Sequence, residues 1–154
     1  MWQEPWLSEI DGDSVVVSKS LPQFACFFQR RSRFESADTL RLDYIIRNDG
    51  DEPFKYIYSA HPLLYGSEHT RFELPQEMTE AFVYVALNVP VLADKTWIEW
   101  PQPEATTLNG PYSGDRESVA KLFSGRLSEG RAAVRHLDVG EAIVIDFDTS
   151  ALPY

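Results

Sequence analysis

One histidine stands in a setting that suits acid catalysis. His61 lies in the segment Tyr58-Ser59-Ala60-His61-Pro62-Leu63-Leu64, at the end of an aromatic-rich run. An imidazole has an ordinary pKa of about 6.5, so it exchanges its proton near neutral pH and can act as a general acid. We take His61 as the candidate catalytic residue. From the residues alone, a purely structural histidine is the alternative.

Other groups with chemical potential lack the spacing that a site needs. His69 lies in a polar turn and His136 on a late strand, and neither forms an HxH or HExxH pattern with a neighbour. Scattered glycines make no phosphate-binding loop, and no G-x-S-x-G elbow occurs. Cys26 is the single cysteine and lies among Ala25 and Phe27, as a buried small apolar residue would. We therefore expect no metal site, no cofactor and no serine hydrolase chemistry.

Aromatic residues offer a second kind of chemistry, because a flat ring can stack on a sugar. The candidates for such stacking are Tyr56, Tyr58, Trp97 and Trp100. Core packing is the alternative for all four.

Charge restricts the possible partners. The chain has 14 Lys and Arg against 24 Asp and Glu, a formal net charge of −10, so nucleic acid is excluded as a partner. The basic run Arg30-Arg31-Ser32-Arg33 is interpreted as a solvated strand face, with an anion site as the alternative. No apolar run is long enough to span a membrane and the N-terminus is unlike a signal peptide, so we expect a soluble cytoplasmic protein.

The elements that must position His61 are strands. In residues 40–47, Leu40, Leu42, Tyr44 and Ile46 share one face and Arg41, Asp43 and Arg47 the other, the pattern of a strand with one buried face. Residues 48–53 contain Asp49-Gly50 and Pro53, which predict a turn. Residues 54–61 then predict a second strand that runs back antiparallel to the first. This hairpin would carry His61 at its far end.

Alternation recurs along most of the chain and predicts an all-β fold. The other predicted strands are residues 15–19, 24–34, 71–74, 121–127, 132–137 and 141–147. Residues 77–88 fit a helix or a strand, residues 119–127 fit one helical stretch as an alternative, and residues 97–114 are expected to be largely loop. Short strands with regular turns favour an antiparallel β-sandwich, and the length and lack of repeats favour a single domain over residues 1–154.

One stretch resembles a known family. Its residues are Arg47-Asn48, the acidic turn with Pro53-Phe54, the segment Tyr58 to Leu64 with His61-Pro62, and Thr70-Arg71-Phe72-Glu73-Leu74-Pro75. These motifs resemble those of the galactose mutarotase-like family, the aldose 1-epimerases, whose members commonly carry W-x-x-H-P followed by L-P. Tyr58 stands where tryptophan is frequent in that family. Weaker likenesses are Trp2 to Trp6, Trp100-Pro101, Lys121 to Gly130 and Ile145 to Tyr154.

The resemblance implies a fold, an activity and a role for one residue. It implies that residues 1–154 correspond to the central part of a β-supersandwich that binds a monosaccharide, an aldohexose or its phosphate. It also implies that His61 acts as general acid on the ring oxygen during interconversion of the anomers, without a cofactor. In the family a late glutamate is the base, and neither Glu141 nor Asp148 matches its position.

Two further hypotheses belong to other classes of protein. Under the first of these hypotheses, the chain is a non-catalytic carbohydrate-binding module, and the aromatic residues around His61 form its sugar-binding surface. Alternatively it is a β domain completed by oligomerisation, in which open sheet edges pair with another copy of the chain.

Overall fold

The protein is built of antiparallel β-sheets. A computed structural model describes residues 5–89, 92–100 and 119–152, and within these ranges it contains ten strands, one short 3₁₀ turn and no α-helix. Every strand pairs antiparallel with its neighbour. The prediction of an all-β, sandwich-like fold class is confirmed. Contacts divide the chain into two compact units, Met1–His61 and Pro62–Tyr154, and each is described by itself; the single domain expected over residues 1–154 stays a prediction.

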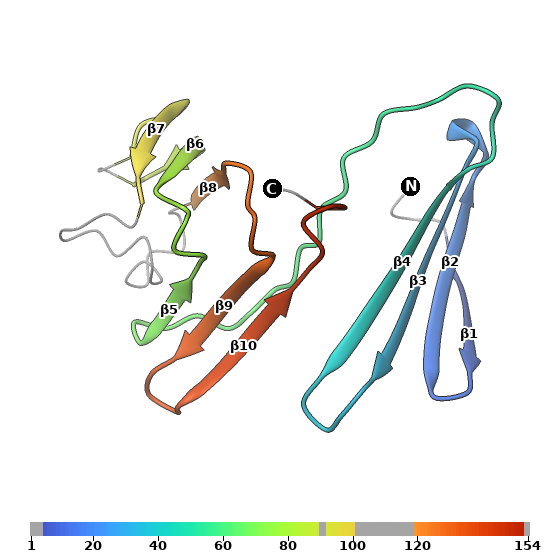
Figure 1. Cartoon of the computed structure of the whole chain (residues 1–154), viewed down its shortest axis with the longest axis horizontal. Coiled ribbons are helices and arrows are strands. Elements are labelled where there is room, and N and C mark those ends of the chain that lie inside the picture. The colour runs from blue at the N-terminus through green and yellow to red at the C-terminus, as the bar shows by residue number, and fades with distance from the viewer. Residues whose placement is uncertain (1–4, 90–91, 101–118, 153–154) are drawn as a thin grey trace. The chain divides into compact units, whose positions relative to one another are not determined.

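The first unit is a four-stranded meander. It consists of β1 (Leu7–Asp11), β2 (Ser14–Leu21), β3 (Cys26–Phe34) and β4 (Leu40–Asn48), hydrogen-bonded in chain order (Figure 1). The predicted strands at residues 15–19 and 40–47 are confirmed. The strand predicted from residue 24 begins at residue 26 instead, because a 3₁₀ turn (Pro22–Phe24) and Ala25 at φ 46° change the chain direction first. β1 was not predicted, since its five residues are all exposed and carry no core pattern.

Cross-strand register gives this sheet two chemically different faces. Residues that face each other across a ladder share a face, so Lys19, Phe28 and Ile46 lie on one face, with Arg30 and Tyr44 beside them. We call this the apolar face. Its other large apolar residues are Ile10, Val15, Val17, Phe34, Leu40 and Leu42.

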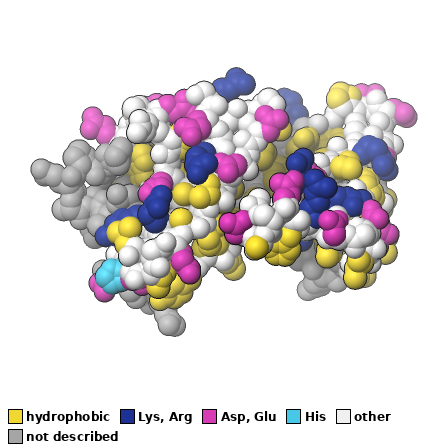
Figure 2. Space-filling view, turned by 60° about the horizontal axis from the view of Figure 1, so that its bottom comes forward, with side chains coloured by type: hydrophobic (Ala, Val, Ile, Leu, Met, Phe, Trp, Pro, Cys, Tyr) yellow, Lys and Arg dark blue, Asp and Glu magenta, His cyan; other side chains and the backbone are white. Residues whose placement is uncertain are grey.

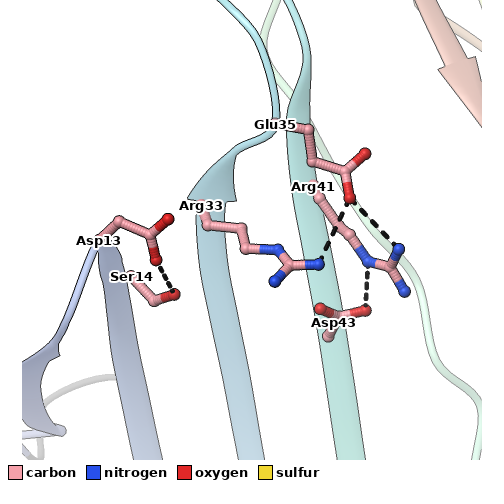
Figure 3. Close-up of polar contacts among 6 residues, drawn as sticks. All are labelled: Asp13, Ser14, Arg33, Glu35, Arg41 and Asp43. Atoms are coloured by element: carbon pink, nitrogen blue, oxygen red, sulfur yellow. Dashed lines mark hydrogen bonds and ion pairs between the residues drawn. The ribbon is translucent and has the colours of Figure 1, made fainter.

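The opposite side, which we call the polar face, carries charged side chains that form ion pairs with one another. Arg31 binds Asp11 at 2.7 Å across β2. Glu35 accepts hydrogen bonds from Arg33 at 3.4 Å and Arg41 at 3.3 Å (Figure 3). Basic and acidic side chains also lie beside one another on the molecular surface of Figure 2. The solvated strand face expected for residues 30–33 is therefore present for Arg31 and Arg33.

The second strand of the expected hairpin is absent, so that prediction is wrong. Residues 54–61 form no strand, and β4 pairs with β3 instead (Figure 1). The reason lies in residues 48–52: the Asn48 side chain accepts from the Gly50 N–H at 3.0 Å and donates to the Glu52 carbonyl at 2.9 Å. The Asp49 N–H still bonds back to Ala25 at 2.7 Å. This turn leads the chain away from the ladder, and Pro53 cannot donate to a new one.

The second unit contains two three-stranded sheets. One has the order β10-β9-β5, from β5 (Thr70–Glu73), β9 (Arg131–His136) and β10 (Glu141–Asp146). The other has the order β7-β6-β8, from β6 (Glu80–Leu87), β7 (Thr96–Glu99) and β8 (Val119–Ser124). The predicted strands at residues 71–74, 121–127, 132–137 and 141–147 are confirmed within one to three residues at each end.

Ladder pairing settles the segments that the sequence left open. Within residues 77–88, residues Glu80–Leu87 form the strand β6, and β8 is a strand rather than the alternative helix, because both enter one ladder. Residues 97–114 were expected to be largely loop, and the structure places their first three residues in β7, where Trp97 lies opposite Phe82. The rest of that loop, from residue 101, lies outside the described residues.

The buried core of the second unit centres on β6. Val83 is fully buried and packs with Val89 and Leu92. Trp100, Ile98 and Leu122 lie against this cluster, which fixes β7 and β8 on either side of β6. Across the described residues, no helix has the length and apolar character needed to cross a membrane.

Candidate functional site

His61 lies in an extended coil segment and not at a strand end. Its side chain is exposed, and within the described ranges no hydrogen bond or ion pair joins it to another residue. His61 follows Tyr58 by three residues, so their Cα atoms are at most about 11 Å apart.

Four aromatic rings form one connected group, in which Phe28 contacts the other three. The Phe28 ring stacks on Tyr58 with centroids 6.4 Å apart and 23° between planes, and Trp6 meets Phe28 edge-on at 5.5 Å and 88°. Tyr44 lies 5.0 Å from Tyr58 and 6.2 Å from Phe28, both tilted. We call Trp6, Phe28, Tyr44 and Tyr58 the aromatic cluster. Edge-to-face and offset contacts of this kind stabilise one another by about 0.5–1.5 kcal/mol beyond burial.

The fold brings these rings together from four separate segments. Register places Phe28 and Tyr44 on the apolar face, on the neighbouring strands β3 and β4. Trp6 comes directly before β1, and Tyr58 folds back over the sheet because the chain leaves the ladder at residues 48–52. Because residues 54–61 do not form the expected strand, Tyr58 packs on the face of the sheet and not along its edge.

The cluster stays partly open to solvent and carries polar groups at its margin. Trp6 keeps 46% of its surface exposed and Tyr44 keeps 37%. The Lys19 side chain is buried, and its ammonium lies 5.9 Å from the centre of the Trp6 ring. Burial, followed by a hydrogen bond with Tyr44, raises the pKa of the Tyr58 phenol, while the nearby charge of Arg30 opposes the rise. Tyr58 is thus a neutral hydroxyl at physiological pH.

The arrangement combines a partly exposed aromatic platform with phenol hydroxyls and the exposed Arg30 guanidinium. A group of this kind can stack on a flat apolar surface and form hydrogen bonds at its margin.

Of the aromatic residues that the sequence suggested for sugar stacking, only Tyr58 belongs to this cluster. Tyr56 is 61% exposed and packs at 6.0 Å on Phe54. In the second unit, Trp97 packs on Phe82 at 5.3 Å, and Trp100 belongs to the core around Val83.

The remaining candidate groups take structural roles. His69 lies 3.6 Å from Glu68 in an exposed turn, and the Nδ1 atom of His136 lies 3.2 Å from the buried hydroxyl of Thr70. Asp148 accepts from the Ser150 N–H at 2.8 Å. Glu141 is the exposed first residue of β10.

Potential metal ligands do not gather in the part of the chain that the structure describes. No group of three or more His, Cys, Asp or Glu side chains is placed there so as to hold an ion. Cys26 is buried, and its thiol lies 3.7 Å from the Phe27 carbonyl oxygen.

Sequence reasoning missed Trp6, Phe28 and Tyr44 as site residues. Alternation had placed Tyr44 on an apolar strand face, but that pattern gives no cross-strand register. A signal for the missing residues was nevertheless present: β3 and β4 are joined by the short connection 35–39, which predicts antiparallel neighbours. Placing Phe28 next to Tyr44 follows once that hairpin is assumed.

Comparison with known proteins adds no relative. No protein-family model matches the chain, and no curated protein and no solved structure matches it. The likeness to aldose 1-epimerases therefore rests on the short motif around His61, and function must be argued from the residues.

Proposed function

We propose that the protein binds a monosaccharide, an aldohexose or its phosphate, at the aromatic cluster of the first unit. The observation that carries the proposal is an aromatic platform, partly exposed at Trp6 and Tyr44, with polar groups at its margin and His61 a few residues along the chain. Ring stacking supplies affinity, and the phenol groups supply direction. A phosphate on the sugar would find the exposed Arg30 on the same face.

Anomer interconversion is the second candidate, favoured by the exposed and unpaired imidazole of His61. Protonated His61 gives its proton to the ring oxygen, the bond between that oxygen and the anomeric carbon breaks, and the anomeric hydroxyl loses its proton. Rotation of the resulting aldehyde and reclosure give the other anomer. The described residues place no carboxylate in contact with His61, so water takes the hydroxyl proton, and the rate gain is that of acid assistance alone, about 10²–10⁴-fold at most.

Two measurements on the whole chain separate these functions. Calorimetric titration with glucose, galactose and their 6-phosphates tests binding, and we expect heat of binding from at least one of them. Polarimetry of freshly dissolved α-glucose or α-galactose tests the reaction. Binding with an unchanged rate of mutarotation supports a sugar-binding module and rejects the epimerase. Absence of binding to every sugar rejects the proposal as a whole.

A further inference from the structure

The outer edge of β4 is open. β4 is the last strand of its sheet, and across the described residues its backbone is hydrogen-bonded to β3 alone. An open strand edge presents a row of unpaired N–H and C=O groups that can pair with another strand. At nine residues, β4 is as long as any strand in the molecule's described part.

Hydrogen bonds at both ends of the β3–β4 ladder show which groups point outward. The Glu35 N–H bonds to the Thr39 carbonyl at 2.9 Å, and the Asp49 N–H bonds to the Ala25 carbonyl at 2.7 Å. Bonded and non-bonded pairs alternate in an antiparallel ladder, so the odd-numbered residues of β4 bond to β3. The even-numbered residues, Leu40 to Asn48, therefore direct their N–H and C=O groups outward.

The charges along this edge are complementary to themselves. On the polar face the order is Arg41, Asp43, Ile45, Arg47 and Asp49. Suppose that the β4 strand of a second copy lies antiparallel to this one, with a two-fold axis at Ile45. Each residue then faces the residue of the other copy that lies equally far from Ile45 but on its other side in the sequence. Arg41 then meets Asp49 of the other copy and Asp43 meets Arg47, while Ile45 meets itself. Every charge in this row faces an opposite charge.

Side-chain exposure agrees with such a partner. Arg41, Asp43, Arg47 and Asp49 keep between 39% and 59% of their side chains exposed, although they already form ion pairs along their own strand. Ile45 is 49% exposed at the centre of an otherwise charged row. On the apolar face, the same pairing sets Tyr44 opposite Ile46 and Leu42 opposite Asn48 of the other copy.

Neighbouring registers fail on charge or on length. An axis at Tyr44 sets Arg41 against Arg47, an axis at Asp43 sets that residue against itself, and an axis at Ile46 sets Asp43 against Asp49. An axis at Leu42 keeps opposite charges together but pairs only residues 40–44 of the strand. Like charges directly opposite each other destabilise a ladder, so charge selects the register about Ile45.

Three other edge strands in the described chain lack this combination of length and charge. Pairing β1 with a second β1 over its whole length sets Glu9 against Glu9. An axis at Ile143 or Val144 of β10 brings no opposite charges together. β5 can set Arg71 against Glu73 about Phe72, but it has only four residues.

We propose that two copies of the chain associate through β4, antiparallel about a two-fold axis at Ile45, and form one continuous eight-stranded sheet. Tyr44 and Ile46 exchange backbone hydrogen bonds with the other copy, and Ile45 forms a non-hydrogen-bonded pair on the axis. The inference is independent of sugar binding, since it rests on the backbone edge and the polar face.

Charge reversal with rescue tests the proposal. Sedimentation equilibrium of the full chain should give a mass of twice 17.6 kDa. Asp43→Arg should weaken the dimer by about tenfold or more, because both symmetry-related pairs become repulsive. Adding Arg47→Asp restores opposite charges in both pairs, so the double variant should dimerise again. A monomeric wild-type chain, or a dimer that Asp43→Arg leaves unchanged, overturns the proposal.

A cross-link gives a second measurement that does not depend on the charge variants. Two Ile45→Cys residues on the axis would have Cα atoms about 4.5 Å apart, within the range that a disulfide spans. Mild oxidation should therefore produce a covalent dimer. Ile10→Cys, an isoleucine exposed by 83% on the opposite edge, is the matched control and should stay monomeric on a denaturing gel. Equal cross-linking of the two variants also contradicts the proposal.

Discussion

The rings of Tyr44 and Tyr58 lie 5.0 Å apart, and their phenol groups are hydrogen-bonded although one belongs to β4 and the other to coil. This contact holds residues 54–61 against the sheet in place of a strand ladder. It connects the aromatic platform with the segment that carries His61, so several predictions depend on it.

Removing the Tyr58 hydroxyl should change stability in alkali. Burial and the hydrogen bond with Tyr44 raise the pKa of Tyr58 above its ordinary value of 10.0. Tyr58 therefore loses its proton at a lower pH in the unfolded chain than in the folded chain. Its contribution to the free energy of unfolding is complete below pH 10 and is lost as pH rises through the raised pKa. Tyr58→Phe should lower the free energy of unfolding by about 1 kcal/mol at neutral pH. It should also make the decline above pH 10 shallower.

Urea unfolding followed by circular dichroism from pH 8 upward measures both effects. Tyr56→Phe is the matched control, because that phenol is 61% exposed and contacts only Phe54 among the described rings. If the two variants behave alike, the contact between Tyr44 and Tyr58 does not stabilise the first unit.

Trp6→Ala should remove the stacking surface for the sugar. An aromatic contact contributes about 0.5–1.5 kcal/mol beyond area, so affinity should fall by about threefold to tenfold. Calorimetric titration with the sugar that binds the wild-type chain measures the loss. Trp97→Ala, which removes a tryptophan 56% exposed in the second unit, should leave the affinity unchanged. An equal loss in both variants would place the sugar elsewhere.

His61→Gln should separate binding from reaction. We expect mutarotation of the bound sugar to return to the spontaneous rate while the calorimetric affinity changes little, because the amide cannot act as an acid near neutral pH. His69→Gln removes another exposed histidine and should keep the wild-type rate. A rate that survives His61→Gln would exclude this residue as the proton donor.

Thr70→Val should destabilise the sheet β10-β9-β5. Thr70 is only 1% exposed; its hydroxyl oxygen accepts from the Ser67 N–H at 2.9 Å and lies 3.2 Å from the Nδ1 atom of His136. The methyl replacement leaves both partners without this hydrogen bond, at a cost of about 1–3 kcal/mol in the free energy of unfolding.

Thermal and urea unfolding check this cost. In Thr96→Val the lost hydroxyl is exposed, so water can satisfy its acceptor, the Ala93 carbonyl, and the effect should be small. Similar losses in the two variants would show that the buried hydroxyl has no special role.

Gly130→Ala should disturb the same sheet by steric conflict. A Cβ atom at this position would lie 1.8 Å from the carbonyl oxygen of Phe147, where the Phe147 N–H also bonds to Gly130 at 2.8 Å. We expect a loss of about 1–3 kcal/mol or more, because backbone must move to make room. Gly125→Ala is the control, since its Cβ would meet nothing within 4 Å. Comparable urea midpoints for the two variants would contradict the contact.

Strand positions followed from the sequence because alternation is a local property. Residues 40–47 have a mainly apolar side, with Leu40, Leu42, Tyr44 and Ile46, and form the strand β4. Residues 54–61 were also predicted as a strand and do not form one, because the turn at Asn48 and the packing of Tyr58 depend on contacts that alternation does not encode. Trp6 could not be assigned to a site either, since its neighbours Phe28 and Lys19 come from β3 and β2.

The order in which strands pair has a consequence for how the chain folds. Each ladder of the first unit joins strands that follow each other directly, so the meander needs only short loops to close. In the second unit, Thr70 pairs with His136 and Ala81 with Ser124. Closing such long loops slows folding. On a ribosome, the first unit can therefore fold while most of the second is still unmade, and the second must wait until β9 has emerged.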